Sequence, residues 1–379
     1  MDKRFVYMDS AATTEVHPEV VASMMPFFLD SYGNPGGHYK LGEDAKEAVN
    51  KFRTTIANTI NASPDEIIFT SGGSESDNLA IRGVAERYNF GHIITTAIEH
   101  KAVLNACKHL EKMDFAVTYL EPDERGYISP QQVEQAMRDD TVLVSVMMVN
   151  NEIGVIQPIT EIAKICHKHN VVFHTDAVQA FGHIPVDVKS LGADLLSVSG
   201  HKFHAPKGTG FLYVRKGIEL LPLIYGGGQE SGLRGGTENV PGIAGIATAA
   251  ELATRNMRMN YMSGLRDHMI ERIIKEIPKT TLNGSLLNRC PNNVNICIDG
   301  ISGESLLVLL DMRGICASTG SACNSSDGKP SHVLKAIGLS DDQARGSIRF
   351  SLDDAVTIDD VDYVVDVLKD CVEQLRGVS

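Results

Sequence analysis

Residues 141–202 read TVLVSVMMVNNEIGVIQPITEIAKICHKHNVVFHTDAVQAFGHIPVDVKSLGADLLSVSGHK. Three runs in this stretch are rich in β-branched and apolar residues, and they cover 141–149, 171–175 and 195–199. Between the first two, residues 159–169 carry apolar side chains at helical spacing. Strands that alternate with helices are typical of a largely parallel sheet covered by helices on both faces.

The same pattern extends outward from about residue 65 to residue 215. Further strands are predicted at Ile67–Thr70, His92–Ile98, Ala116–Leu120 and Gly210–Val214, and further helices at Lys101–Met113 and Ser129–Arg138. The last two strands are joined by a Gly/Pro-containing turn with no helix, which favours an antiparallel pair at one edge. The chain therefore predicts an α/β fold with a mainly parallel seven-stranded sheet.

Beyond about residue 238 the pattern changes to that of a smaller α+β domain. The predicted elements are a long helix over 241–277, a strand at 293–298, a helix at 303–312, a strand at 347–351 and a closing helix at 358–375.

Composition restricts the class of protein. The 379 residues are 43% hydrophobic and carry 35 Lys+Arg against 48 Asp+Glu, a net charge of −13. Such a balance argues against direct binding of nucleic acid or an acidic membrane. The seven cysteines form no CxxC pair, which argues against a disulfide framework or metal site and favours a reducing compartment. No signal-peptide core and no long apolar run is present, so we expect a soluble, cytoplasmic protein.

Chemically useful side chains follow the predicted strands. Ser71-Gly72-Gly73-Ser74-Glu75 follows the first strand and opens a helix, which suits a phosphate cradle, although an ordinary Gly-rich turn stays an alternative. Other strand ends are followed by Glu99-His100, Asn150-Asn151-Glu152 and Asp176-Ala177-Val178-Gln179. Each group alone is unremarkable, but ligands bind beyond the carboxyl ends of such strands, so together they predict one cleft.

Lys202 leaves a further strand end in the sequence Ser199-Gly200-His201-Lys202. A lysine beside another cationic group can act as an amine nucleophile, whereas most lysines are solvated surface charges. With a phosphate cradle and an acid to pair with a pyridine nitrogen, the lysine favours pyridoxal 5′-phosphate (PLP) as cofactor.

Two irregular segments complete the candidates. Residues 226–237 contain six glycines and end in Thr237, which suits a second phosphate contact, a loop at a subunit interface or a flexible surface loop. Residues 317–332 place Cys323 among small, turn-forming residues, where an accessible thiol can react. Cys316 follows an apolar Gly-Ile pair, so we expect it to pack.

Together these motifs resemble the NifS-like group of cysteine desulfurases, which are fold-type-I PLP enzymes. The resemblance runs from residue 7 to residue 352, nearly the whole chain. Its most specific segments are FTSGGSESDN at 69–78, NNEIGVIQ at 150–157, HTDAVQ at 174–179, SGHK at 199–202 and STGSAC at 318–323. We accordingly predict a large PLP domain over 15–250 and a small domain over 1–14 and 251–379, which carries the cysteine loop at about 317–332.

The resemblance implies roles at individual positions. Lys202 would form the Schiff base, His100 would stack on the ring and transfer protons, and Asp176 would hold the pyridine nitrogen protonated. Arg349 would bind the substrate α-carboxylate, and Cys323 would accept the sulfur as a persulfide. The other implied contacts are Asn151 and Gln179 at the ring hydroxyl or substrate, Gly73, Ser74, Ser199 and His201 at the phosphate, Thr237 from a second subunit, and Asn34 on the substrate side.

This chain departs from the family pattern at several positions. Ser74 replaces the usual threonine, residues 36–39 read Gly-Gly-His-Tyr where Ser-Ser and a histidine are common, Ser231 replaces an arginine, and Asp353-Asp354 replaces Gly-Arg. We expect the last two changes to affect partner docking or substrate affinity more than the chemistry.

The implied reaction removes sulfur from L-cysteine and gives L-alanine in a homodimer that serves an acceptor protein such as an iron–sulfur cluster scaffold. Selenocysteine lyase and class V aminotransferase are the enzyme alternatives, and a PLP-bound scaffold with low turnover is a third. The aminotransferase needs no loop cysteine, and the presence of Lys202, His100 and Cys323 together argues against a scaffold with low turnover.

Overall fold

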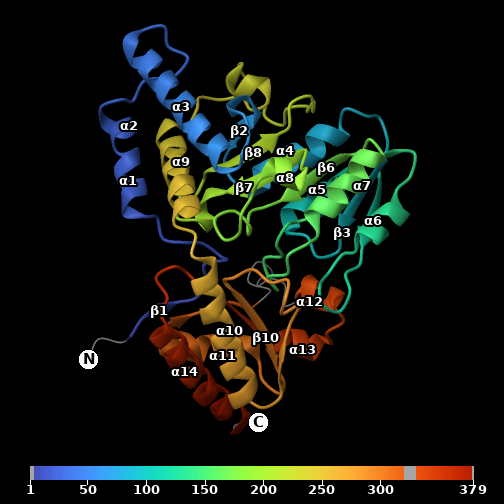
Figure 1. Cartoon of the computed structure of the whole chain (residues 1–379), viewed down its shortest axis with the longest axis vertical. Helices are drawn as coiled ribbons and strands as arrows, with labels where there is room; N and C mark the ends of the chain where they lie inside the picture. The colour runs from blue at the N-terminus through green and yellow to red at the C-terminus, as the bar shows by residue number, and fades with distance from the viewer. Residues whose placement is uncertain (1–3, 320–329, 378–379) are drawn as a thin grey trace.

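A computed structural model describes residues 4–319 and 330–377 of the chain. Figure 1 shows a larger part, built on one wide sheet, above a smaller part that contains the last third of the sequence. In the described part, no helix is long and apolar enough to cross a lipid bilayer.

The large sheet has seven strands in the order β2-β8-β7-β6-β5-β3-β4. All neighbouring pairs are parallel except those of β8, which runs antiparallel to both β7 and β2. The predicted fold class is confirmed, and the antiparallel strand lies one position inside the edge. The strands are β2 (Ile67–Thr70), β3 (His92–Thr96), β4 (Ala116–Leu120), β5 (Thr141–Ser145), β6 (Val172–Asp176), β7 (Leu195–Ser199) and β8 (Gly210–Val214).

Helices cover both faces of this sheet because its strands are apolar on both faces. In β7, for example, Leu195 and Leu196 point to opposite faces and belong to different buried clusters. One face is covered mainly by α4 and α5, the other by α3, α7 and α9. The helices are α1 (Pro18–Met24), α2 (Pro26–Leu29), α3 (Lys40–Thr59), α4 (Gly73–Ala85), α5 (Lys101–Glu111), α6 (Pro130–Ala136), α7 (Ile159–Lys168), α8 (Val188–Leu191) and α9 (Val240–Arg255).

The smaller part has a three-stranded antiparallel sheet in the order β12-β10-β9, with its own apolar core. Its strands are β9 (Thr280–Leu282), β10 (Asn293–Ile298) and β12 (Ser347–Ser351), and its helices are α10 (Met259–Glu276), α11 (Gly303–Met312), α12 (His332–Ala336), α13 (Asp341–Arg345) and α14 (Ile358–Gly377). A parallel pair of short strands, β1 (Val6–Tyr7) and β11 (Ile315–Cys316), joins the beginning of the chain to this part.

The single helix predicted over residues 241–277 is wrong, because the chain turns between α9 and α10 at residues 256–258. The apolar face of α9 packs on the core of the large sheet, and that of α10 packs on the small core. One straight helix could not face both cores. The predicted boundary at residue 250 lies inside α9, so we propose that the domains meet at residues 256–258; the other domain limits stay a prediction.

Candidate active site

The N-terminus of α4 forms an anion site beside β7. Its N-cap is Gly72, at φ +146°, and no side chain caps the helix. The positive φ favours glycine at position 72, and a Cβ on Gly73 would lie 2.9 Å from Val178 Cγ2, so position 73 favours glycine as well. Uncapped amide groups at a helix N-terminus attract an anion, and the Ser199 hydroxyl is placed to help bind it. Ser74, also predicted here, is exposed in the first turn of α4.

Asp176 ends β6 and is 4% exposed. Its Oδ1 accepts the N–H of Val178 at 2.8 Å, and no residue in the described part of the chain donates to Oδ2. Burial raises the pKa of Asp176, while His100 and Lys202 oppose that rise. The carboxyl is therefore placed to pair with a cationic ring nitrogen.

His100 caps α5, and its Nδ1 accepts the N–H of Ala102 at 3.2 Å. A ring nitrogen that accepts a hydrogen bond carries no proton, so the neutral ring carries it on Nε2. Burial lowers the pKa of His100, and Lys202 lowers it further, against the attraction of Asp176. His100, Asp176 and Lys202 thus lie within electrostatic reach of one another, as the sequence predicted.

Lys202 lies in the 3₁₀ turn after β7, and its partners come from the beginning of the chain. Its Nζ donates to the carbonyl oxygens of Ala11 and Ala12 at 2.7 and 2.8 Å. Gln179 Nε2 also donates to Ala11 O at 3.0 Å, and His201 Nδ1 lies 3.2 Å from Thr13 Oγ1. We call residues 9–14 the N-terminal segment. No role for it was predicted, although the resemblance begins at residue 7 and so includes it.

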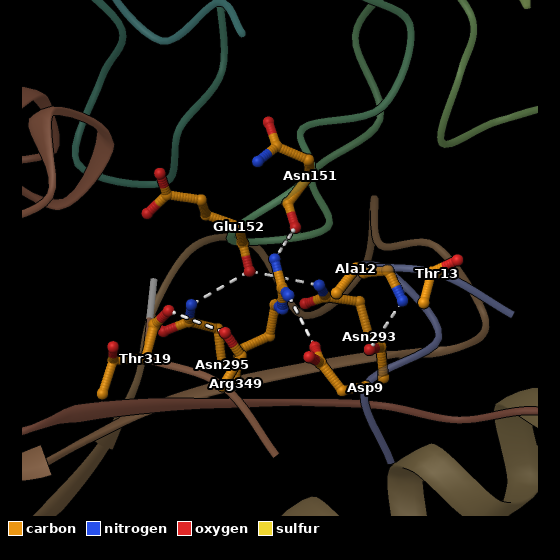
Figure 2. A network of polar contacts seen from close by, with 12 residues as sticks. Asp9, Ala12, Thr13, Asn151, Glu152, Asn293, Asn295, Thr319 and Arg349 are labelled. Atoms are coloured by element: carbon orange, nitrogen blue, oxygen red, sulfur yellow. Dashed lines mark hydrogen bonds and ion pairs between the residues drawn. The ribbon is translucent and has the colours of Figure 1, made fainter. Parts of the chain in front are cut away.

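Arg349 reaches the site from β12 in the smaller part. Its Nη2 donates to Asp9 Oδ1 at 2.8 Å and its Nη1 to Asn151 O at 2.9 Å (Figure 2). Its Nε is buried and has no partner among the described residues. The turn after Asn151 is held because Asn293 and Asn295 both donate to Glu152 O, at 3.1 and 2.9 Å. The Asn151 side chain extends away from the guanidinium (Figure 2).

This arrangement fits PLP. The uncapped end of α4 with Ser199 would hold its phosphate, the buried Asp176 Oδ2 its ring nitrogen, and Lys202 its carbonyl carbon. Burial lowers the pKa of His201 to about 4, so its neutral ring can donate one N–H to the phosphate.

Three predicted residues are not placed in this cluster. Asn34 is exposed, and its Oδ1 accepts the N–H of Gly36 in its own loop. Thr237 is exposed in the glycine-rich loop, which Arg234 joins to Glu75 of α4. Cys323 lies outside the described residues.

The residues before and after the undescribed segment 320–329 contact the site. Ser318 exchanges two backbone hydrogen bonds with Arg349. On the other side, the Ser331 hydroxyl donates to the Glu152 carboxyl, and His332 Nε2 lies 2.9 Å from Glu99 O. Ser318, before the segment, is therefore bonded to Arg349. Ser331 and His332, after it, are bonded to Glu152 and Glu99, the sequence neighbours of the predicted site residues Asn151 and His100.

Of the departures from the family pattern, Asp353 forms side-chain contacts, and Ser231 lies next to a residue that does. Asp353 Oδ2 accepts from Ser10 Oγ at 3.2 Å and lies 3.5 Å from His204 Nε2, so it holds the N-terminal segment. Ser231 is exposed at φ +56°, next to Glu230, which forms a bidentate pair with Arg53. Their effect on docking and affinity stays a prediction.

Glu99 is a fully buried titratable group within electrostatic reach of Asp176. Glu99 Oε1 accepts from Met147 N at 2.8 Å and Thr96 Oγ1 at 3.0 Å, and Oε2 has no partner among the described residues. Burial raises the pKa of Glu99 to about 8. At neutral pH this side chain is therefore a neutral acid.

We expect Glu99→Gln to remove one source of pH-dependent stability. Between pH 4.5 and about 8 the unfolded state loses the Glu99 proton and the folded state keeps it. Wild-type stability should therefore fall across this window by up to about 1.4 kcal/mol per pH unit from this group, and the variant should escape that loss. Melting temperatures against pH would measure the widening difference, with exposed Glu124→Gln as control. A melting-temperature difference between the wild type and Glu99→Gln that does not change with pH would contradict the raised pKa of Glu99.

Comparisons with known proteins agree over nearly the full chain. Residues 6–364 match the model of a family described as aminotransferase class-V. A protein named cysteine desulfurase IscS from Methanosarcina thermophila is 51% identical over 100% of this chain and 94% of its own. A solved NifS-like protein superposes with a TM-score of 0.92 at 39% identity, covering 98% and 100% of the two chains. A structure described as SspA in complex with cysteine superposes with a TM-score of 0.83 at 43% identity, covering 91% of this chain and 98% of its own.

Proposed function

The chain belongs to the aminotransferase class-V family, in which it is a PLP-dependent cysteine desulfurase, and we propose that Lys202, His100 and Cys323 carry out its chemistry. The observation that supports the roles of Lys202 and His100 is their convergence with Asp176 at the ends of β7, β3 and β6. Arg349 faces them from the smaller part of the chain through its bonds to Asp9 and Asn151.

When bound, PLP supplies an electron-accepting ring that stabilises negative charge at the substrate Cα. Asp176 holds a proton on the ring nitrogen, and Lys202 Nζ removes the α-proton of cysteine. His100 presents its Nε2–H to the reacting groups, and Arg349 binds the α-carboxylate.

Cys323 then takes the sulfur. Its thiolate attacks the substrate sulfur, the carbon–sulfur bond breaks, and the former substrate leaves as alanine after it gains a proton. The sulfur stays on Cys323 as a persulfide, from which an acceptor can remove it.

We expect Arg349→Gln to raise KM for cysteine by roughly 10²-fold with a smaller change in kcat, because the guanidinium N–H donors that hold the carboxylate are lost. Steady-state alanine release would measure both constants, with exposed Arg125→Gln as the matched control. An unchanged KM would exclude Arg349 from carboxylate binding.

The remaining contacts are part of the same proposal. At the phosphate we place Gly73, Ser74, Ser199 and His201, and at the ring or substrate Asn151 and Gln179, with Asn34 on the substrate side. Thr237 is exposed in this chain, which supports its assignment to the site of a second subunit in a homodimer. A fully active monomer in sedimentation would contradict that assignment.

We further propose that the protein works in the cytoplasm and delivers sulfur to an acceptor such as an iron–sulfur cluster scaffold. The six described cysteines are all free, which fits a reducing compartment. Selenocysteine stays an alternative substrate, and parallel kinetics on the two amino acids would decide between them.

A further inference from the structure

Arg349, the residue proposed to bind the substrate carboxylate, already has a carboxylate partner. Asp9 Oδ1 lies 2.8 Å from Arg349 Nη2, and the two side chains are 19% and 6% exposed. Among the described residues, Asp9 is the only acid whose carboxylate lies within ion-pair distance of this guanidinium. A substrate carboxylate therefore enters a site whose positive charge is already balanced.

The backbone fixes Asp9 in this position. Asp9 forms a β-bridge with Ser351, which lies two residues beyond Arg349 on β12 and so on the same face of the strand. Asp9 O accepts the N–H of Ala12 at 2.9 Å and the hydroxyl of Tyr7 at 3.1 Å. The turn thus uses the main chain of Asp9 and leaves its carboxylate to Arg349.

The guanidinium keeps unused hydrogen-bond donors in spite of this pairing. A guanidinium has five N–H groups; one bonds to Asn151 O and one to Asp9, and the Nε–H has no partner among the described residues. A second carboxylate can therefore still be hydrogen-bonded. Asp9 repels this second carboxylate and so weakens its attraction to Arg349.

We propose that Asp9 sets the affinity for the amino acid by balancing the charge of Arg349, so that the α-carboxylate is bound by hydrogen bonds without a full ion pair. This rests on the role of Arg349 proposed above. Asp9 is then a positioning and charge-balancing residue, and its effect is to keep the product alanine easy to release.

The test is Asp9→Asn in the holoenzyme, because asparagine keeps an acceptor for Arg349 Nη2 and removes only the charge. Binding of L-alanine, measured by equilibrium dialysis, should become roughly tenfold tighter, since a buried cation without a counter-charge gains more from an incoming carboxylate. Alanine should also inhibit cysteine turnover more strongly, and KM for cysteine should fall. If Asp9 had only a structural role, Asp9→Asn would weaken alanine binding. The direction of the change in alanine affinity therefore separates a structural role from charge balancing.

Asp360→Asn is the matched control, because Asp360 also pairs with an arginine, but with Arg4 at the beginning of the chain instead of Arg349. It should leave alanine binding unchanged. If Asp9→Asn lowers the melting temperature, the rise in melting temperature that alanine produces should still exceed that of the wild type.

Arg349→Gln and the double variant separate the possible failures. Weaker binding in Arg349→Gln, with no further effect of Asp9→Asn in the double variant, supports the proposal. Weaker or unchanged binding in Asp9→Asn, together with weaker binding in Arg349→Gln, would overturn the role of Asp9 alone. Unchanged binding in Arg349→Gln would overturn the carboxylate role itself, and the Asp9 proposal with it.

Discussion

Replacing Lys202 with alanine is expected to reduce cysteine turnover by roughly 10⁵-fold, the scale seen when a residue at the centre of covalent catalysis is removed. The lysine is proposed both to attach the cofactor and to move the α-proton, and alanine can do neither. The amine also donates to Ala11 O and Ala12 O, so the variant loses two of the contacts that join the 3₁₀ turn to the N-terminal segment.

The cofactor gives a readout that is independent of turnover. Lys202→Ala should lose the visible absorbance of lysine-bound PLP, while exposed Lys216→Ala should keep both absorbance and activity. A variant that kept the cofactor in a form that does not exchange would show that another residue binds it.

Replacing Cys323 with serine should leave cofactor binding intact and reduce sulfur transfer by roughly 10³-fold or more, because a hydroxyl cannot hold a persulfide. Burial raises the pKa of all six described cysteines, so each is a poor nucleophile at neutral pH. They are Cys107, Cys166, Cys290, Cys297, Cys316 and Cys371. The remaining cysteine of the sequence is Cys323.

Mass spectrometry after incubation with cysteine would detect the extra sulfur atom on the peptide that contains Cys323. Cys316→Ser is the matched control, and it should keep the persulfide and the transfer rate. Transfer at the wild-type rate by Cys323→Ser would exclude this residue as the sulfur carrier.

Much of the site was predictable because its chemistry depends on side chains at strand ends. Asp176, His100 and Lys202 each follow an apolar run that could be recognised as a strand, and parallel strands bring their ends to one edge. The glycines at 72 and 73 were also recognisable, because they follow a predicted strand and open a helix, where the backbone can approach an anion closely.

Other features left no comparable signal. Ala11 and Ala12 act through carbonyl oxygens, so their side chains do not reveal the contact with Lys202. Asp9 and Arg349 are 340 residues apart, and no local pattern connects them. The break between α9 and α10 was missed because apolar spacing continues through it, and only the separation of the two cores requires a turn.

The N-terminal segment has a consequence for biosynthesis. Its partner strand β12 is among the last elements to leave the ribosome, whereas the segment itself is among the first. During translation the large sheet can form with Lys202 in place, but Asp9 has no guanidinium to pair with until residue 349 has been added. Contacts of such long sequence separation form slowly, so the amino-acid site is completed after most of the fold. A nascent chain that stops early would therefore carry the lysine without the means to hold its substrate.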